Sequence, residues 1–115
     1  MIKIKDISTA LSLFEDAAKK HAEATREGDY KTGNKNYNKV IKAVSYLKEQ
    51  DSIDELLSYL NHDVIGVRLA AATYLLPKHE KKGTEVLEAI SKSSDFFSFI
   101  AQTTLNEWRK GNLIL

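Results

Sequence analysis

The feature that most constrains the fold is the stretch 53–77, which reads IDELLSYLNHDVIGVRLAAATYLLP. Its apolar residues recur at spacings of three and four, the pattern of helices that each bury one face. Two such patterns meet at the polar corner Asn61-His62-Asp63. Pro77 ends the second, because proline lacks an amide donor and clashes with the preceding turn. The stretch therefore predicts two short helices joined by a tight corner.

A second copy of this pattern follows at a shift of 30 residues. The shift superimposes apolar residues in both helices: Leu56 on Val86, Leu57 on Leu87, Leu60 on Ile90, Val67 on Phe97, Ala71 on Ala101 and Leu75 on Leu105. One offset covers both helices and the corner, and a period in this range is typical of stacked helical repeats. We therefore interpret 53–76 and 83–106 as one helical hairpin built twice.

Periodicity and capping residues predict helices over about 6–27, 30–50, 52–61, 64–76, 84–92 and 95–110. Gly28-Asp29 separates the first two and Gly111 ends the last. Residues 1–5 alternate isoleucine with lysine, which suits a short extended arm or an irregular start. The predicted fold class is all-α, with a single domain over residues 1–115. Its expected architecture is a short right-handed solenoid (an α-α superhelix) of three antiparallel helix pairs.

Each long helix is expected to bury one apolar face. In the first helix this face is Ile7, Leu11, Phe14, Ala18, Ala22 and Thr25, and in the second it is Gly33, Tyr37, Val40, Ile41, Val44 and Leu47. In the last helix Phe96, Phe97, Ile100, Ala101, Leu105 and Trp108 form the apolar set, and Phe99 falls off the inward stripe. Residues 78–83 are expected to be a polar connector.

The stretch 53–77 resembles one HEAT-type repeat, with Asp63, Val67, Arg68, Ala70, Ala71 and Leu75 at the matching positions. Alanines let two helix backbones approach closely, Asp63 is suited to cap the second helix, and Arg68 is placed to reach carboxylates or carbonyls between stacked units. In HEAT-type units these two positions act as an intramolecular cap and clamp.

From Ala22 to Gly111 the whole chain is similar to a small bacterial family of HEAT-like helical domains of unknown function. The similarity rests on the stretch from Gly28-Asp29 to Asn34, on Leu56-Leu57 with the Asp63 to Ala71 motif, and on Ala101, Leu105 and Trp108-Arg109-Lys110-Gly111. This resemblance implies a fold and no activity.

The chain has 17 basic and 16 acidic residues and a net charge of +1, which argues against a nucleic-acid footprint over the whole surface. It has no cysteine, so disulfides, thiolate metal sites and cysteine nucleophiles are excluded. No apolar run approaches the roughly 18 residues of a membrane span, and no apolar segment follows the lysines of MIKIKDIST. We therefore expect a cytoplasmic protein that does not contact a membrane.

No residue set predicts catalysis, and we expect no cofactor, no metal and no enzymatic activity. His21, His62 and His79 lack the spacing that puts two imidazoles on one metal. Acids at a helix start, here Asp51, Asp54 and Glu55, are explained by the free amides and the dipole. The serines lack a nearby histidine and acid pair. An enzyme whose catalytic groups are dispersed along the chain remains an alternative.

The lysines of the second helix gather on one side of it. Lys31, Lys35, Lys39 and Lys42 fall within about 80° of arc on the second helix, flanked by Asn34 and Asn38. A solvated helix face explains them, and so does a surface for an acidic protein or a phosphate backbone. A nucleic-acid-binding HEAT-like domain that uses this stripe is therefore a second alternative.

The leading hypothesis is a non-enzymatic module that binds another protein, because stacked helical repeats present extended faces. Its partner face is expected on the second helix of each pair, at Lys35, Asn38, Arg68 and Trp108. A narrower version is an immunity or adaptor protein of a bacterial toxin system. The sequence names no partner, and it leaves open whether Leu113–Leu115 packs on its own chain or on another.

Overall fold

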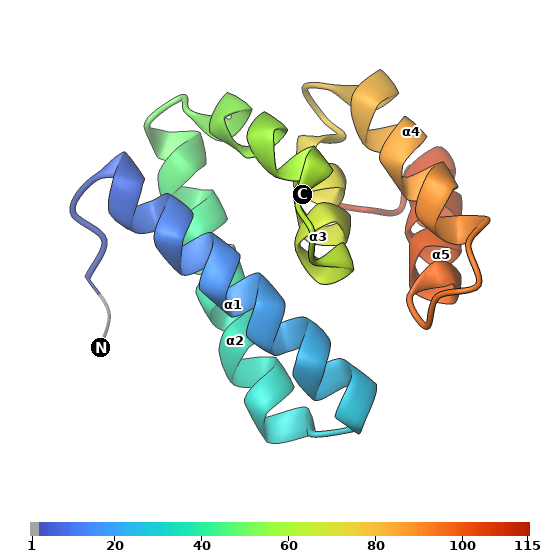
Figure 1. Cartoon of the computed structure of the whole chain (residues 1–115). Helices are drawn as coiled ribbons and strands as arrows, with labels where there is room; N and C mark the ends of the chain where they lie inside the picture. Colours follow the sequence, from blue (N-terminus) through green and yellow to red (C-terminus); the bar gives the residue numbers. More distant parts are fainter. Residues whose placement is uncertain (1–2) are drawn as a thin grey trace. The chain divides into compact units, whose positions relative to one another are not determined.

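A computed structural model describes residues 3–115 of the chain (Figure 1). The first two residues of the expected arm at 1–5 lie outside the described residues. The elements are α1 (Ile7–Glu27), α2 (Tyr30–Glu49), the 3₁₀ helix η1 (Ile53–Asn61), α3 (Ile65–Leu75), α4 (Glu80–Ser91) and α5 (Ser98–Arg109). No strand occurs between residues 3 and 115, so the predicted all-α class is confirmed.

The chain divides into two compact units, and each is described by itself. Unit 1 extends to Leu56 and holds α1, α2 and the first half of η1, whereas unit 2 runs from Leu57 to Leu115 and holds the rest. The single domain expected over residues 1–115 stays a prediction, because the compactness of each unit by itself does not test it.

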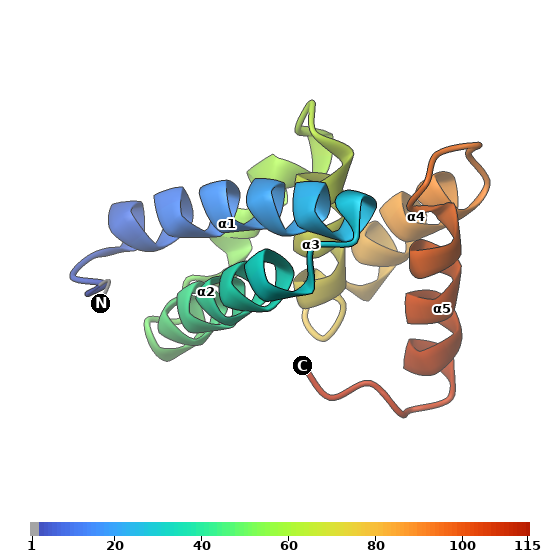
Figure 2. The ribbon, with the colours of Figure 1, turned by 90° about the horizontal axis from the view of Figure 1, so that it is seen from below.

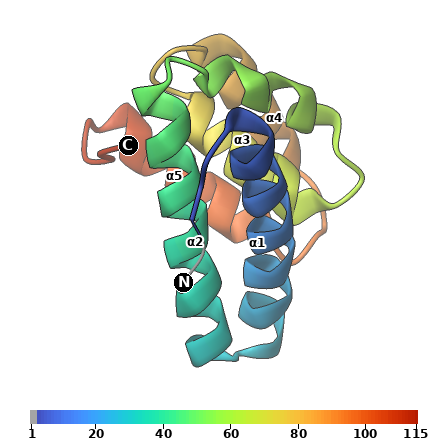
Figure 3. The same cartoon turned by 90° about the vertical axis from the view of Figure 1, so that its left-hand side faces the viewer.

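In unit 1, α1 and α2 lie side by side and are joined by a two-residue turn (Figure 3). The Asp6 carboxylate caps α1 by accepting from the Thr9 amide at 2.7 Å, and the Asp29 carboxylate caps α2 by accepting from the Thr32 amide at 3.2 Å. Hydrogen bonds from these threonines hold the pKa of both carboxyl groups below their usual range. Gly28 ends α1 at φ 76°, a left-handed conformation that glycine adopts without strain. The predicted Gly28-Asp29 break is confirmed.

The buried face of α2 differs from the prediction. Tyr37 and Ile41 were expected inside, but 48% of Tyr37 and 36% of Ile41 are exposed, and Asn36 and Ala43 are buried instead. The facing side of α1 is rich in alanine, and a methyl group added at Gly33 would lie 3.8 Å from the Ala24 Cβ. Because the two backbones come close, small residues occupy the contact and the larger ones lie at its edges.

The predicted helix over 52–61 is present as η1, but it is a 3₁₀ helix. A 3₁₀ helix has three residues per turn, so residues three apart lie on one side. Ile53 and Leu56 are buried, whereas Leu57 and Leu60 are only half-buried. The sequence pattern grouped all four as one inward face, and the tighter helix separates them into two ridges.

In unit 2, α4 begins at Glu80, so the polar connector expected over 78–83 was predicted too long. The error is at Gly83, which lies inside the helix. A Cβ built on Gly83 would meet the Ala72 carbonyl oxygen at 2.7 Å and the Leu76 Cδ2 at 3.1 Å. Gly83 is therefore required for the close approach of α4 to α3, and it does not end a loop.

The corner before α5 is longer than predicted, because α5 begins at Ser98 rather than near Asp95. The Asp95 amide donates to the Ser93 Oγ at 3.2 Å, and the Asp95 Oδ1 accepts from the Phe97 amide at 2.9 Å. These bonds satisfy the local backbone in a turn. Phe97 is buried, but half of Phe96 and 77% of Phe99 are exposed. The prediction for Phe99 is thus confirmed, whereas the prediction that Phe96 is inward is wrong.

In the second helix of each repeat the paired positions are all buried: Val67 with Phe97 (the residue before α5), Ala71 with Ala101 and Leu75 with Leu105. In the first helices, each pair joins one buried and one half-buried residue. In unit 2, α3 packs against α4 and α4 against α5, and beyond Gly111 the tail turns away from α5 (Figure 2). No helix between residues 3 and 115 has both the length and the apolar character to cross a bilayer.

Candidate functional site

An open groove lies between η1, the start of α3 and α4, within unit 2. Its larger part measures 470 Å³ and is lined by Leu60, Asn61, Ile65, Arg68, Glu85, Val86, Ala89, Ile90 and Ser93. Its smaller part measures 310 Å³ and is lined by Leu57, Leu60, Asn61, Lys82, Glu85 and Val86. The two parts share four residues, so we treat them as one feature, the η1–α4 groove. Each is within the range of roughly 300–1,000 Å³ that is common for binding sites.

The floor of the η1–α4 groove is apolar because of the 3₁₀ geometry of η1. Leu57 and Leu60 are three residues apart, so they form one ridge on the side away from Ile53 and Leu56. Leu57, Leu60 and Val86 are half-buried, and Ala89 is exposed. These residues present hydrocarbon at the surface.

The corner at one end of the groove is held by Arg68. Its Nη1 donates to the His62 carbonyl at 2.6 Å and to the Asp63 carbonyl at 3.2 Å. The Val64 amide donates to the His62 Nδ1 at 3.0 Å, and the His62 ring meets Tyr59 edge-on at 5.9 Å. Arg68 is therefore a clamp on the carbonyls of the preceding corner, the kind of contact expected for it.

The predicted cap by Asp63 is wrong. Val64 occupies the N-cap position of α3, with φ −86° and ψ 120°, and no side chain caps this helix. Asp63 contributes its main-chain carbonyl to Arg68 instead. The His62 Nδ1 accepts a hydrogen bond from the Val64 amide. The N-cap of α3 therefore lies one residue later than a carboxylate cap at Asp63 would place it.

The rim of the groove is charged with both signs. Arg68, Lys82 and Glu85 line it, with the uncharged polar residues Asn61 and Ser93. An apolar floor with a polar rim is the usual anatomy of a protein-binding surface. The rim carries two cations and one carboxylate, an excess of one positive charge, and one of the cations, the Arg68 guanidinium, is already bound to the corner carbonyls.

The structure separates Arg68 from Trp108, two residues of the predicted partner face. Arg68 lines the groove beside Ala89, Ile90 and Ser93, toward the C-terminal end of α4. The Trp108 indole Nε1 donates to the Glu80 carboxylate at 2.6 Å, at the first residue of α4. Nine residues of helix separate Glu80 from Ala89, or about 13 Å along the axis. Trp108 is therefore outside the η1–α4 groove.

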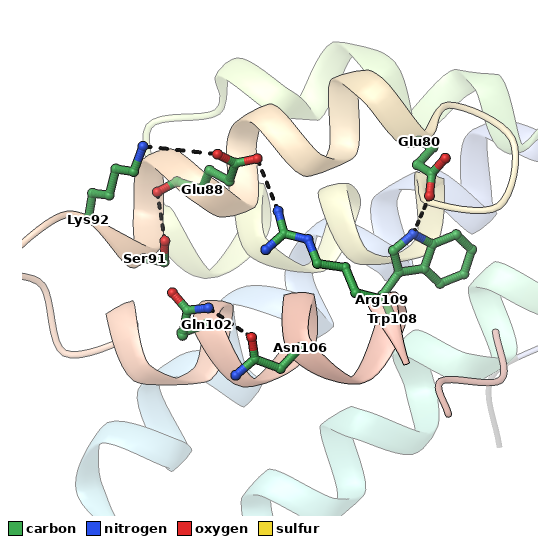
Figure 4. A network of polar contacts seen from close by, with 8 residues as sticks. All are labelled: Glu80, Glu88, Ser91, Lys92, Gln102, Asn106, Trp108 and Arg109. Atoms are coloured by element: carbon green, nitrogen blue, oxygen red, sulfur yellow. Dashed lines mark hydrogen bonds and ion pairs between the residues drawn. The ribbon is translucent and has the colours of Figure 1, made fainter. Parts of the chain in front are cut away.

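Trp108 belongs instead to polar contacts that join α5 to α4 (Figure 4). The Arg109 Nη2 lies 3.2 Å from the Glu88 Oε1, and the Lys92 Nζ lies 4.0 Å from the other oxygen of Glu88. These side chains are substantially exposed, and exposed ion pairs contribute roughly 0–1 kcal/mol each. These contacts orient α5 on α4, so we interpret the half-buried Trp108 indole as a structural residue.

Lys35 and Asn38, the other two predicted partner residues, are exposed on α2 in unit 1. Lys31 and Lys42 are exposed beside them, and Lys39 is half-buried. The predicted lysine stripe is thus at the surface, on a different unit from the η1–α4 groove.

Between residues 3 and 115, no three histidine, aspartate or glutamate side chains gather in a way that suits a metal ion. His21 packs against Tyr37 with ring centroids 5.8 Å apart, and burial lowers its pKa below 6.5. Asp51 ends α2 at φ 53°, apart from the acids Asp54 and Glu55 in the first turn of η1. Asp51 therefore lies just beyond the end of α2, whereas Asp54 and Glu55 lie at the start of η1.

Sequence reasoning placed Leu57, Leu60 and Val86 in the core and so missed them as surface residues. The residue pattern carried no warning, because an α-helix places apolar residues at spacings of three and four on one buried face. The 3₁₀ form, which decides which leucines turn outward, has no comparable signature in the residue types.

No curated protein and no solved structure matches the chain. A family model described as a domain of unknown function (DUF2019) matches residues 9–107, nearly the whole chain. The protein therefore belongs to the DUF2019 family.

Proposed function

We propose that the protein is a non-enzymatic module that binds another protein, and that the η1–α4 groove receives a segment of that partner. The observation that carries the proposal is the apolar floor formed by Leu57, Leu60 and Val86 beneath a charged rim. Surface hydrocarbon in a concave site favours binding because its burial releases water, with about 25 cal/mol for each Å² buried.

The chemistry of the groove favours binding over catalysis. Arg68 and Glu85 both line it, but the Arg68 guanidinium is engaged with the carbonyls of His62 and Asp63. A catalytic site needs a nucleophile or a base together with a group that orients it. Lys82 and Ser93 also line the groove, but the Ser93 Oγ is engaged in the local turn, where it donates to the Ile90 carbonyl at 2.7 Å and accepts from the Asp95 amide at 3.2 Å. An enzyme with dispersed groups is the alternative that measured turnover of a small substrate would establish.

The test begins with affinity purification of the full chain from its native host, followed by binding measurements with the purified partner. Ala89→Arg is the test variant, because Ala89 is exposed and lines the groove, so a long side chain there obstructs the site without entering the core. Thr103→Arg, at an exposed position of α5, is the matched control. We expect at least tenfold weaker binding for Ala89→Arg alone. Recovery of no partner, or equal binding by both variants, contradicts the proposal.

We further infer that the fold is a short HEAT-like right-handed solenoid of three antiparallel helix pairs. The 30-residue repeat and the matched burial of α3 and α5 positions support this architecture. An experimental structure tests it by superposition of 53–76 on 83–106. The inference fails if the two hairpins do not superimpose or do not contact each other.

A narrower proposal, from the resemblance of the chain to small helical bacterial domains, is an immunity or adaptor role in a toxin system. The near-neutral charge of +1 argues against inhibition of a basic nuclease, for which an acidic surface would steer association. A toxin gene directly upstream in the host genome supports this version, and an unrelated metabolic operon contradicts it.

A further inference from the structure

The outward side of α2 carries two parallel rows of side chains. At 100° per residue, Lys31, Lys35, Lys39 and Lys42 fall within about 80° of arc, and we name them the basic row. Tyr30, Tyr37 and Ile41 fall within about 40° on one side of it, and we name them the apolar row. Asn34 and Asn38 lie between the rows. This face belongs to unit 1, so it is independent of the η1–α4 groove.

Both rows are at the surface. The exposed fraction is 84% for Tyr30, 48% for Tyr37 and 36% for Ile41. In the basic row Lys31, Lys35 and Lys42 are exposed and Lys39 is half-buried. Large apolar side chains aligned along one exposed edge of a helix mark a contact surface more strongly than scattered ones do.

The charge of the face has one sign. Five lysines lie on α2, and its only acid is Glu49 at the last position. Neither Lys31 nor Lys35 has a carboxylate within ion-pair distance in the described part of the chain. From Lys31 to Lys42 the basic row extends about 16 Å along the axis, roughly three helical turns.

We propose that the outward face of α2 binds an acidic helical segment of another protein. Lys31 and Lys35 are one turn apart, about 6 Å, and acids four residues apart on a partner helix repeat at the same distance. An apolar ridge beside those acids then covers Tyr37 and Ile41. Opposite charges arranged along parallel rows fix the register as well as the attraction.

The apolar row favours a protein segment over a nucleic acid. A single strand gains its affinity from bases stacked on open aromatic faces. Tyr37 already packs against the His21 ring, with centroids 5.8 Å apart and planes inclined by 44°. Ile41 has no aromatic face, so Tyr30, 84% exposed at the first residue of α2, is the one open ring of the row, and one ring does not stack successive bases. An aliphatic ridge on a partner helix suits Tyr37 and Ile41, because it needs only their exposed edges.

The test uses the full chain and four synthetic probes in fluorescence anisotropy at low and high salt. The first probe is a helical peptide of about 20 residues with glutamates at four- and three-residue spacing beside a leucine row. The second has glutamine for each glutamate. The third and fourth are a 20-nucleotide single strand of thymidylate and a 20-base-pair duplex.

The test variant is Lys31→Glu with Lys35→Glu. The control is Lys81→Glu with Lys110→Glu, which makes the same change in net charge at exposed positions outside α2 and outside the groove. Because the reversal replaces two attractive charge pairs with repulsive ones, we expect about tenfold weaker binding of the acidic peptide by the test variant. Circular dichroism of both variants confirms that the helices are intact.

The proposal is supported if the glutamate peptide binds, if the glutamine peptide binds at least tenfold more weakly, and if only the test variant loses binding. It is overturned if the glutamate peptide does not bind at low salt, if both variants bind it equally, or if either oligonucleotide binds more tightly. The proposal predicts that the Ala89→Arg variant still binds the glutamate peptide. Failure of this proposal is therefore distinguishable from failure of the proposal for the η1–α4 groove.

Discussion

Gly83 shows how a single residue sets the distance between two helices. Its missing Cβ leaves the space that the Ala72 carbonyl oxygen occupies, and any side chain there must push α4 away from α3. Gly33 makes the contrast, because a methyl group there meets Ala24 at an ordinary 3.8 Å. Both glycines lie in helices, where glycine costs about 0.5–1 kcal/mol relative to alanine.

Replacement of these two glycines by alanine should therefore have opposite effects. Gly83→Ala is expected to lower the free energy of unfolding by about 1–3 kcal/mol through overpacking. Gly33→Ala is expected to raise it by about 0.5–1 kcal/mol, because alanine restricts the unfolded chain. Urea denaturation followed by circular dichroism measures both. A stabilising Gly83→Ala would show that α3 and α4 are not this close.

Asn36 is the one polar residue buried with an unpaired atom among residues 3–115. Its Nδ2 donates to the Thr32 carbonyl at 2.9 Å, but its Oδ1 accepts no hydrogen bond. A buried unsatisfied oxygen costs about 1–3 kcal/mol. We expect Asn36→Leu to leave stability unchanged or raise it by up to about 2 kcal/mol, since leucine also favours helix. A large loss of stability in thermal unfolding would indicate that Oδ1 has a partner in solution.

His21 makes stability depend on pH in a defined direction. Burial lowers its pKa below 6.5 in the folded chain, so the unfolded chain binds the proton more readily. The neutral imidazole therefore contributes stability that is fully present above pH 6.5 and decreases as pH falls from there to the folded pKa.

The comparison that isolates this effect is with His21→Gln, because the two proteins differ only at this residue. The difference in free energy of unfolding should be constant above about pH 7.5 and should shift against the wild type below 6.5. A difference that does not vary between pH 8 and 5 refutes the effect of burial on His21.

At the scale of the element, the residue types predicted the helix ends, which depend only on residues nearby in the sequence. The cap at Asp29 follows from a side chain that acts within a few residues, and the left-handed ends at Gly28 and Gly111 follow from the absence of one. The buried face of α2 and the start of α4 did not follow. Both depend on how closely a neighbouring helix approaches, and that distance is set by small residues elsewhere in the chain.

The same distinction applies to η1 and to the candidate site. A period of three and a period of 3.6 are hard to separate over nine residues, so the pattern gave a helix and not its type. Because η1 is a 3₁₀ helix, Leu57 and Leu60 face the groove. Arg68 was predicted as a clamp between stacked units, but its side chain binds the carbonyls of its own corner, and the contact of Trp108 depended on Glu80, 28 residues away.

The two ridges of η1 predict unequal costs of truncation. Leu56 is fully buried, so Leu56→Ala should cost about 2–5 kcal/mol of unfolding free energy. Leu60 is half-buried in the groove, so Leu60→Ala should cost clearly less and should weaken partner binding instead. Chemical denaturation of both variants gives the comparison. Equal costs would argue for an ordinary α-helix with a single inward face.

At the scale of the whole molecule, two surfaces on two units offer different chemistry. Unit 2 presents an apolar groove with a rim of mixed charge, and unit 1 presents a basic row beside an apolar row. We propose that each surface receives a segment of another protein, so binding should be visible as protection of these residues from solvent.

Amide hydrogen exchange of the full chain, with and without the partner recovered from the host, tests this account most directly. We predict that the partner slows exchange at residues 57–61 and 85–90, the two sides of the η1–α4 groove, and that Ala89→Arg abolishes this protection. Protection confined to α5, or no change in either side of the groove when the partner is bound, would contradict the central claim.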